Sequence, residues 1–417
     1  MSIPLPDPSG STAHKVRLAY LVSHPIQYQA PLLRRIAQEP DIDLTVFFGS
    51  DFSVRGYKDE GFGVSVKWDV PLLEGYRHEF LPALRDTSGV SVTSPISRGI
   101  LSRLHGRNGE PGFDALWVHG YATVNAMHGI LAANALGIPV LLRAESWLRD
   151  RSRSGAKLVA KRLFFGMLKH LVDATLPIGT LNSAYWRHYL GEDFPQFLMP
   201  YAVDNAYFQQ RSVAAQAGRA DLLAELDLDP SRPVILFASK LQQRKHCDDL
   251  LEAYLRLSPG KGVEPHPYLV IVGDGEMRSS LEKSAAATGF KSIRFCGFRN
   301  QSELPRFFDI ASVFVLPSRH EPWGLIVNEV MNAGRAVIIS DDVGCQPDLI
   351  TDGVEGAIFP ARAVEALKEA LERVLASPET TAGMGQRALD RIRSWSFEED
   401  IRGLREALAA ITGRISA

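Results

Sequence analysis

The stretch VFVLPSRHEPWGLIVNEVMNAGRAVIISDD (313–342) contains the pattern that decides the fold. Its two ends, 313–318 and 336–342, are short apolar runs of the kind that form buried parallel strands. The segment between them has the apolar spacing of a helix and follows a loop that contains proline and glycine. A strand, a loop, a helix and a second strand form the repeating unit of a doubly wound α/β sheet.

The same alternation of apolar runs and helical patterns occurs twice along the chain. Its first instance contains the predicted strands VRLAYLVS (16–23), LTVFFG (44–49), ALWVHG (115–120) and VLLRAES (140–146). After a polar, Ala-rich stretch (209–232), the pattern starts again with VILFAS (234–239), YLVIVGDG (268–275), IRFCGF (293–298) and the two strands of the opening stretch. We therefore predict an α/β protein with two Rossmann-like domains that face each other across a cleft.

The boundary between the two predicted domains lies near PYAVDNAYF (200–208), where we expect a hinge. The N-terminal domain is expected over 1–205 and the C-terminal domain over 206–394. A last amphipathic pattern predicts a helix within 395–417, which we expect to pack back on the N-terminal domain. Ligands of open α/β sheets bind at the carboxyl ends of the strands, so the loops after the predicted strands are the places to look for a site.

Composition excludes several classes of function. The chain has 417 residues, of which 45% are hydrophobic and 23% charged, as in an ordinary globular protein. Its formal net charge of −2 gives no reason to expect nucleic acid as a partner. The isolated cysteines 247, 296 and 345 fit a reducing compartment and offer no zinc motif. Residues 1–15 lack the apolar core of a signal peptide, and no apolar run reaches the roughly eighteen residues of a membrane span. We expect a cytoplasmic protein.

Two carboxylates, Glu321 and Glu329, stand around the start of the predicted helix. An acid near a helix N-terminus is favoured, but this explains only the first of the two. Backbone N–H groups at the helix start would suit an anion such as a diphosphate, and the acids beside it would suit sugar and ribose hydroxyls. The pattern therefore indicates a nucleotide sugar. The alternative is that Glu321 is a helix-start acid and Glu329 a salt-bridged surface acid. The helix-start N–H groups belong to Gly324, Leu325 and Ile326.

A basic loop, SKLQQRK (239–245), follows the first strand of the second domain. Its Lys240 and Lys245 have the charge to hold a diphosphate near the next helix. The alternative is a solvated basic loop, which is the usual explanation for such a run. GDGEM (273–277) lacks the spacing of a dinucleotide fingerprint and is better explained as a structural turn.

The C-terminal half, from about 234 to 360, resembles the retaining family-4 glycosyltransferases of GT-B fold. The resemblance rests on FASKLQQRK, VIVGDGEM, FCGF, the opening stretch and DGVEGAIF. It implies that Glu321 contacts the donor sugar, that Glu329 holds the ribose and that Lys245 binds the diphosphate. Lys240 stands where the family usually has an arginine, and lysine lacks the bidentate geometry of a guanidinium. Phe298 belongs to the CGF loop, whose backbone contacts the base in the family.

The N-terminal half resembles the family less closely and corresponds to its acceptor domain. SHPIQYQAP (23–31) and FGVSVKWDVPLLEGY (62–76) are similar to a bacterial subgroup associated with polysaccharide and glycoconjugate synthesis. His119 matches a family histidine near the reacting centre of the donor sugar, which implies a catalytic role. His24, Gln27 and Glu145 are candidates for the acceptor side, because each follows a predicted strand.

The resemblance implies a retaining transfer of a sugar from a nucleotide-diphosphate donor to a hydroxyl acceptor, without a protein nucleophile. Because lysines and a helix N-terminus would meet the diphosphate charge, we expect no metal and no other cofactor. The acceptor would be a carbohydrate, a lipid-linked molecule or another small molecule. Alternatives are a GT-B sugar-nucleotide epimerase, a phosphorylase, or a non-catalytic subunit that binds nucleotide sugars.

A basic amphipathic pattern covers 149–169, where arginines and lysines alternate with large apolar side chains. A helix with this pattern can lie on an anionic membrane surface, so the protein could be peripheral at the inner face of the membrane. The alternative is a surface helix that packs its apolar side on the sheet.

Overall fold

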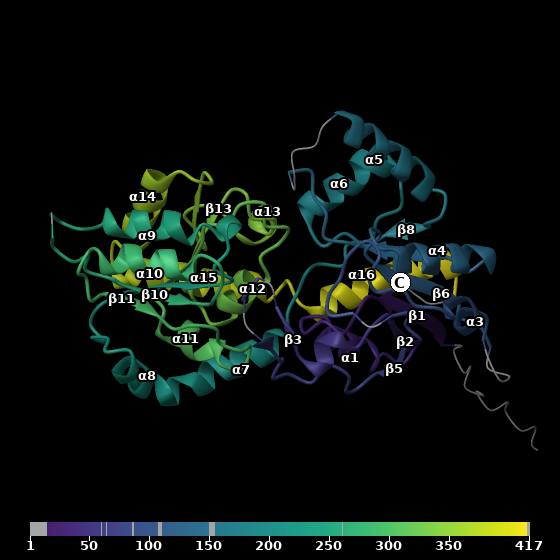
Figure 1. Ribbon diagram of the computed structural model, residues 1–417, viewed down its shortest axis with the longest axis horizontal. Coiled ribbons are helices and arrows are strands. Elements are labelled where there is room, and N and C mark those ends of the chain that lie inside the picture. Colours follow the sequence, from purple (N-terminus) through teal and green to yellow (C-terminus); the bar gives the residue numbers. More distant parts are fainter. Residues whose placement is uncertain are drawn as a thin grey trace, which may run out of the picture.

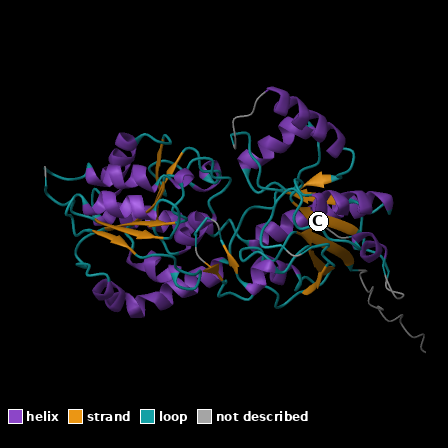
Figure 2. Ribbon diagram, viewed as in Figure 1, coloured by secondary structure: helices purple, strands orange, loops and turns teal. Residues whose placement is uncertain are grey.

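The computed structural model describes residues 15–59, 61–63, 65–85, 87–106, 111–149, 155–260 and 262–414. The N-terminal tail and residues 151 and 153 of the basic pattern lie outside this range. Two six-stranded sheets form the two halves of the molecule, with strand orders β5-β2-β1-β6-β7-β8 and β11-β10-β9-β12-β13-β14. All neighbours within these two sheets are parallel. The prediction of two Rossmann-like domains is confirmed, and Figures 1 and 2 show one sheet between helices in each half.

The first half contains the following elements, in chain order within each kind. Its strands are β1 (Val16–Val22), β2 (Ile42–Phe48), β3 (Tyr57–Lys58), β4 (Ser65–Val66), β5 (Arg77–Phe80), β6 (Ala115–His119), β7 (Val140–Arg143) and β8 (Ala174–Thr175). Its helices are α1 (Ala30–Ile36), α2 (Phe52–Arg55), α3 (Ile100–His105), α4 (Val124–Ala135), α5 (Gly155–Leu168) and α6 (Thr180–Leu190). β3 and β4 form a separate antiparallel pair.

The second half has the same layered plan. Its strands are β9 (Val234–Ala238), β10 (Tyr268–Val272), β11 (Ile293–Phe295), β12 (Val313–Leu316), β13 (Ala336–Ser340) and β14 (Gly356–Phe359). Its helices are α7 (Asn205–Ala215), η1 (Gln216–Gly218), α8 (Arg219–Glu225), η2 (Gln243–Lys245), α9 (Cys247–Leu255), α10 (Arg278–Ala286), α11 (Leu304–Ile310), α12 (Leu325–Asn332), α13 (Gln346–Leu349), α14 (Val364–Val374) and α15 (Pro378–Ile392).

The strands at the centre of each sheet are buried on both faces, which explains why they appear as continuous apolar runs in the sequence. Every residue of β9, β10, β12 and β13 is buried. In each sheet, successive strands are added first on one side of the first strand and then on its other side. The strand order therefore switches between β1 and β6 and between β9 and β12. A crevice opens at such a switch point, beyond the carboxyl ends of the strands. The two crevices are therefore the expected places for ligand.

The stretch 209–232, polar and rich in alanine, is more ordered than its composition suggests. It contains most of α7 and all of α8, and both helices pack against α11 of the second half. Buried Phe208, Ser212 and Leu222 make this contact face. Alanines and exposed polar side chains hide the short apolar stripe, because a helix of two or three turns needs few apolar residues to dock.

The last helix, α16 (Phe397–Thr412), returns to the first half of the molecule. Figure 1 shows it beside β1 and α1, far along the chain from both. Ser396 begins it with a capping box that Glu399 completes. Asp400 pairs with Arg143 of β7 at 3.1 Å, and both side chains are fully buried. The polypeptide thus passes between the two halves twice, near 200–205 and near 393–397.

Candidate functional site

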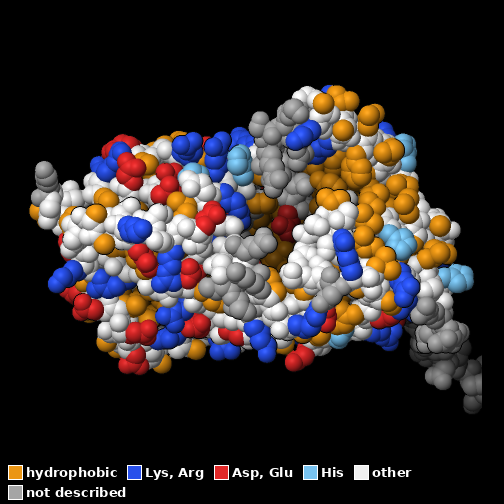
Figure 3. All heavy atoms as spheres, viewed as in Figure 1, with side chains coloured by type: hydrophobic (Ala, Val, Ile, Leu, Met, Phe, Trp, Pro, Cys, Tyr) orange, Lys and Arg blue, Asp and Glu red, His pale blue; other side chains and the backbone are white. Residues whose placement is uncertain are grey.

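A cavity of about 430 Å³ lies between the two halves, at the carboxyl ends of β1 and β9. Figure 3 shows the hollow between them, with apolar and acidic side chains inside it. Many of the side chains singled out from the sequence line this cavity. They are His24 and Gln27 from the first half, and Lys240, Lys245, Phe298, Leu325, Ile326 and Glu329 from the second. Residues from both halves of the chain, as far apart as His24 and Glu329, therefore meet in one place.

The start of α12 has the geometry expected of an anion site. Gly324 precedes the helix with φ of 90°, a left-handed conformation that L side chains rarely adopt. A Cβ there would lie 3.0 Å from Leu316 and 3.1 Å from Val343. The first turn of a helix leaves its N–H groups without intrahelical partners, and two residues of that turn, Leu325 and Ile326, line the cavity.

Glu329 is buried in the cavity wall and lacks a full set of partners. Its side chain is 9% exposed, and its Oε2 atom has no hydrogen-bond partner among the described residues. Burial raises the pKa of Glu329 to about 8, although a hydrogen bond with Gln301 acts in the opposite direction. Buried polar atoms are normally paired, so this carboxyl group would gain from a ligand hydroxyl.

Glu321 does not line the cavity and lies behind Lys245. Its Oε2 atom accepts hydrogen bonds from Lys245 Nζ and, at 3.1 Å, from Arg244 Nη1. Burial alone would raise the pKa of Glu321, but the charges of Lys245 and Arg244 hold it below its usual value. Burial likewise lowers the pKa of Lys245, against the attraction of Glu321. Two residues that the resemblance assigns to different parts of a donor, Glu321 and Lys245, are therefore ion-pair partners.

On the first half, His119 belongs to a network that the sequence reveals only in part. Glu145 Oε1 lies 3.6 Å from His119 Nε2 and accepts hydrogen bonds from the hydroxyl groups of Tyr28, at 2.9 Å, and Tyr201. Burial would raise the pKa of Glu145, but these hydrogen bonds and the charge of His119 lower it to about 2. Gln29 Nε2 lies 3.1 Å from the His119 ring nitrogens. Glu145 is placed to orient His119.

Gln29, Tyr28 and Tyr201 were not predicted from the sequence. Gln29 and Tyr28 are within the quoted SHPIQYQAP loop, but nothing in the pattern distinguishes them from its other polar residues. Tyr201 lies in the connection between the halves. Its hydroxyl group contacts Glu145, which is 56 positions away in the chain, so the sequence gives no sign of this contact.

His24 lies at the edge of the cavity. Its Nδ1 atom is 2.8 Å from Ser23 Oγ, and its ring lies 4.5 Å from that of Phe52. Burial lowers the pKa of His24 to about 4, with a further contribution from His119. His24 is therefore neutral at physiological pH and can donate or accept a hydrogen bond, as an acceptor hydroxyl would require.

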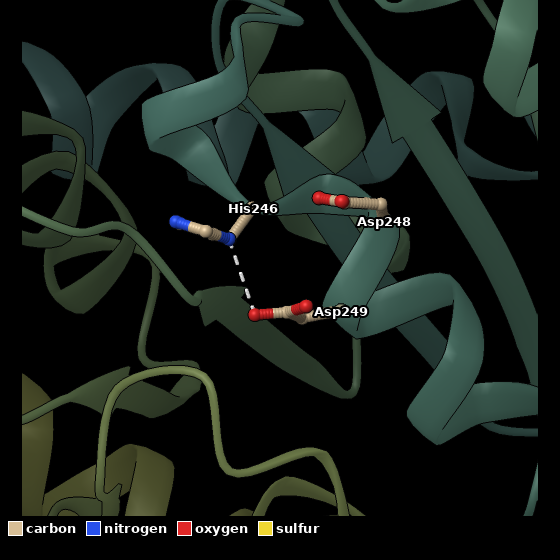
Figure 4. A group of neighbouring side chains, drawn as sticks. All are labelled: His246, Asp248 and Asp249. Atoms are coloured by element: carbon tan, nitrogen blue, oxygen red, sulfur yellow. Dashed lines mark ion pairs between the residues drawn. The ribbon is translucent and has the colours of Figure 1, made fainter.

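A group of side chains with metal-ligand chemistry follows Lys245 directly. Figure 4 shows His246, Asp248 and Asp249, whose ligand atoms lie within 4.8 Å of one another. His246 Nδ1 is 3.2 Å from Asp249 Oδ2. Both acids stand in the first turn of α9, where unpaired N–H groups favour negative charge. This position accounts for the acids without an ion, and none of the three residues lines the cavity.

Residues 219–391 match the family of glycosyl transferases group 1. This group 1 region contains Lys240, Lys245, Glu321 and Glu329 but none of the N-terminal half. Among curated relatives, alpha-D-kanosaminyltransferase of Streptomyces kanamyceticus is 30% identical over 182 residues, which cover 43% of this chain and 46% of the relative. A D-inositol 3-phosphate glycosyltransferase of Segniliparus rotundus is 24% identical, with 69% of this chain and 64% of that protein covered. The chain thus matches about half to two thirds of the length of these relatives.

Solved structures match the whole arrangement of both halves. Sucrose-phosphate synthase from Thermosynechococcus elongatus has a TM-score of 0.66 at 18% identity, and covers 95% of this chain and 100% of its own. Anabaena HepE in complex with UDP has a TM-score of 0.69 at 15% identity, with the same coverage. The chain has the GT-B fold, as the sequence predicted.

Proposed function

We propose that this protein is a retaining glycosyltransferase that transfers a sugar from a nucleotide-diphosphate donor to a hydroxyl acceptor in polysaccharide or glycoconjugate synthesis. The observation that carries the proposal is the wall of the cavity. There a helix start, two lysines and a buried, incompletely paired carboxyl group lie together. The group 1 region contains all of them, and the relatives that it matches are named as glycosyltransferases.

The donor would lie along the C-terminal side of the cavity. Its diphosphate would contact Lys240, Lys245 and the N–H groups at the start of α12, and its ribose would contact Glu329. The loop that carries Phe298 would contact the base. The sugar would then point towards the N-terminal half, where His119 lies behind the residues that line the cavity, with the acceptor on the side of His24 and Gln27.

The charges of this site make a metal unnecessary in the proposed reaction. Positive groups beside the diphosphate stabilise the charge that develops on the leaving group, which is the largest contribution available without a metal. The leaving diphosphate would help to take the proton of the acceptor hydroxyl. His119, oriented by Glu145, would stabilise the donor sugar. Glu321, which is paired with Lys245 outside the cavity lining, would do so once the diphosphate engages that lysine. Turnover is expected to survive EDTA, and an absolute requirement for added Mn²⁺ or Mg²⁺ would contradict this part of the proposal.

A screen of nucleotide sugars tests the function. Thermal-shift and saturation-transfer measurements identify the donor, and product analysis with and without acceptors identifies the reaction. Transfer with retention at the anomeric carbon supports the proposal. Conversion of the donor without an acceptor would indicate an epimerase, release of a sugar phosphate from a glycoside would indicate a phosphorylase, and binding without turnover would indicate a non-catalytic subunit.

We also propose that α5 places the enzyme on the inner face of an anionic membrane. Among the described residues, every helix is too short or too polar to reach across a bilayer. α5 stands away from the sheet at the edge of the N-terminal half (Figure 1), and of its residues only Phe165 and Leu168 are buried. Val159, Leu163 and Met167 are 57%, 65% and 64% exposed. Lys157 and Arg162, also exposed, would meet lipid phosphates beside them.

Sedimentation with vesicles tests this contact. The parent should bind vesicles that contain phosphatidylglycerol more strongly than vesicles of phosphatidylcholine alone. Leu163→Asp should weaken that binding, whereas Leu131→Asp, on α4 and 52% exposed, should not. Equal binding of both variants would assign α5 to ordinary surface packing.

A further inference from the structure

A turn of the N-terminal half contacts the donor side of the cavity, on the C-terminal half. We call residues 57–59 and 61–63 the Asp59 turn. Both carboxylate oxygens of Asp59 accept hydrogen bonds from Lys240 Nζ, at 2.8 and 2.9 Å. The two residues are 181 positions apart in the chain and belong to different halves. Lys240 is the lysine that the proposed function assigns to the donor diphosphate.

The Asp59 carboxylate is held in place from several directions. The backbone N–H groups of Gly61 and Phe62 donate to its Oδ1 atom at 2.8 and 3.0 Å, and the Tyr57 hydroxyl lies 3.3 Å from Oδ2. Asp59 is 7% exposed. Burial would raise the pKa of Asp59, but Lys240 and the two N–H groups keep it below its usual value. The Asp59 carboxylate is therefore held in a fixed position beside Lys240.

The same turn contacts a second residue assigned to the donor. The Phe62 ring lies edge to face with that of Phe298, with centroids 4.7 Å apart, and Lys240 Nζ is 4.7 Å from the centre of the Phe62 ring. Phe62, Asp59, Lys240 and Phe298 all line the one cavity. Two of the groups that would hold the diphosphate and the base are thus already engaged by the opposite domain.

Both lysines of the cavity have a carboxylate partner within the protein. Lys240 pairs with Asp59, and Lys245 pairs with Glu321. The Glu321 pair lies within the C-terminal half and is behind the cavity wall. The Asp59 pair is different, because it joins the two halves and lies on the cavity surface, where a phosphate would have to approach.

We propose that Asp59 holds Lys240 at the place where a donor phosphate would bind, so that the donor binds by displacing this carboxylate. The inference rests on the proposed function, since it requires a nucleoside diphosphate in this cavity. Asp59 then weakens every donor by the same exchange. Asp59 is a positioning residue that acts through Lys240 and sets donor affinity.

Calorimetry with nucleoside diphosphates and monophosphates tests the exchange. Asp59→Asn removes the charge but keeps an acceptor for the Gly61 and Phe62 N–H groups. It should tighten diphosphate binding about two- to fivefold, the range of a partly exposed ion pair. A monophosphate whose phosphate reaches Lys240 should gain by the same factor, because it displaces the same carboxylate. Asp59→Ala should change affinity in the same direction, and a melting curve like that of the parent verifies that each variant is folded.

Two further variants isolate the Lys240 contact. Asp69→Asn is the matched control, because Asp69 joins the same part of the N-terminal half to Ser302, away from Lys240, and should leave affinity unchanged. In a Lys240→Ala background, Asp59→Asn should have no effect. If diphosphates bind but Asp59→Asn matches Asp69→Asn or weakens binding, the exchange is wrong. If no variant binds any nucleoside diphosphate, the proposed function itself fails.

Discussion

Glu321 and Glu329 come from one loop and helix and are both buried, but their neighbours give them different chemistry. Lys245 and Arg244 keep the pKa of Glu321 low, whereas burial with a single partner raises that of Glu329 to about 8. Their spacing in the sequence was enough to mark both as site candidates. Their partners were not predictable, because Lys245 is 76 positions from Glu321 and meets it only once β9 and β12 pair.

The raised pKa of Glu329 predicts a pH dependence of stability. Between about pH 4.5 and 8 the folded protein keeps the Glu329 proton, whereas the unfolded chain loses it, so stability falls as pH rises through this window. Glu329→Gln does not titrate, so it should not share this loss. The free energy of unfolding of the variant relative to the parent should therefore rise by about 2–4 kcal/mol between pH 5 and pH 9. Melting temperatures measured across this range test the prediction. Glu406→Gln, on the exposed side of α16, should follow the parent at every pH.

Replacement of Glu329 and replacement of Glu321 should also have different effects on donor binding and turnover. Glu329→Gln should weaken binding of the nucleoside diphosphate about tenfold, because the ribose is present with or without the sugar. Glu321→Gln should leave that affinity within about threefold but lower turnover, since its contact matters most as charge develops on the transferred sugar. Diphosphate affinity and initial rate are measured for each variant. Equal loss of affinity in both would refute the separate assignments.

At the scale of elements, the strands that pair on both sides were predictable, whereas of the edge strands of the two large sheets only β11 was predicted. β9, β10, β12 and β13 appear as apolar runs because sheet and helices cover both of their faces. β5 has the sequence RHEF and is partly exposed, and β8 has two residues, so neither has a periodic pattern. The Asp59 turn was equally invisible, because its contacts depend on how two separately folded sheets face each other.

The start of α12 depends on the backbone conformation of Gly324. Gly324→Ala should destabilise the protein by about 1–3 kcal/mol, through its left-handed backbone and the close approach to Leu316 and Val343. It should also weaken diphosphate binding, because the helix start moves. Gly166→Ala, inside α5 with no atom near the new Cβ, should instead be neutral or slightly stabilising. Thermal melting and calorimetry of both variants check the pair.

At the scale of the whole molecule, one buried arginine forms hydrogen bonds with both segments that join the halves. Arg143 Nη2 donates to the carbonyl groups of Met199 and Pro200, at 2.9 Å each, and to Asp400. The Tyr201 carbonyl accepts from Asn328 of α12 and from the Trp395 indole. The ring of Trp395 stacks on Trp323 in the loop that carries Glu321. Both passages of the chain therefore meet beside the site.

Breaking the Arg143–Asp400 pair should destabilise the protein strongly. Asp400→Leu alone leaves a buried guanidinium without its carboxylate and should cost about 3–5 kcal/mol. Replacing both partners, Arg143→Met with Asp400→Leu, should recover much of that loss, because no charge then remains buried. A double variant with a melting temperature no higher than that of Asp400→Leu would mean that other contacts of Arg143 dominate.

The return of α16 to the first half has a consequence for synthesis. A ribosome completes the first sheet long before it reaches residue 397, and the whole second domain is made in between. During that interval Arg143 lacks Asp400, and the face of α1 that α16 covers stays open to solvent. The N-terminal half is therefore finished last although it is translated first. Its maturation waits for the domain that would bind the donor.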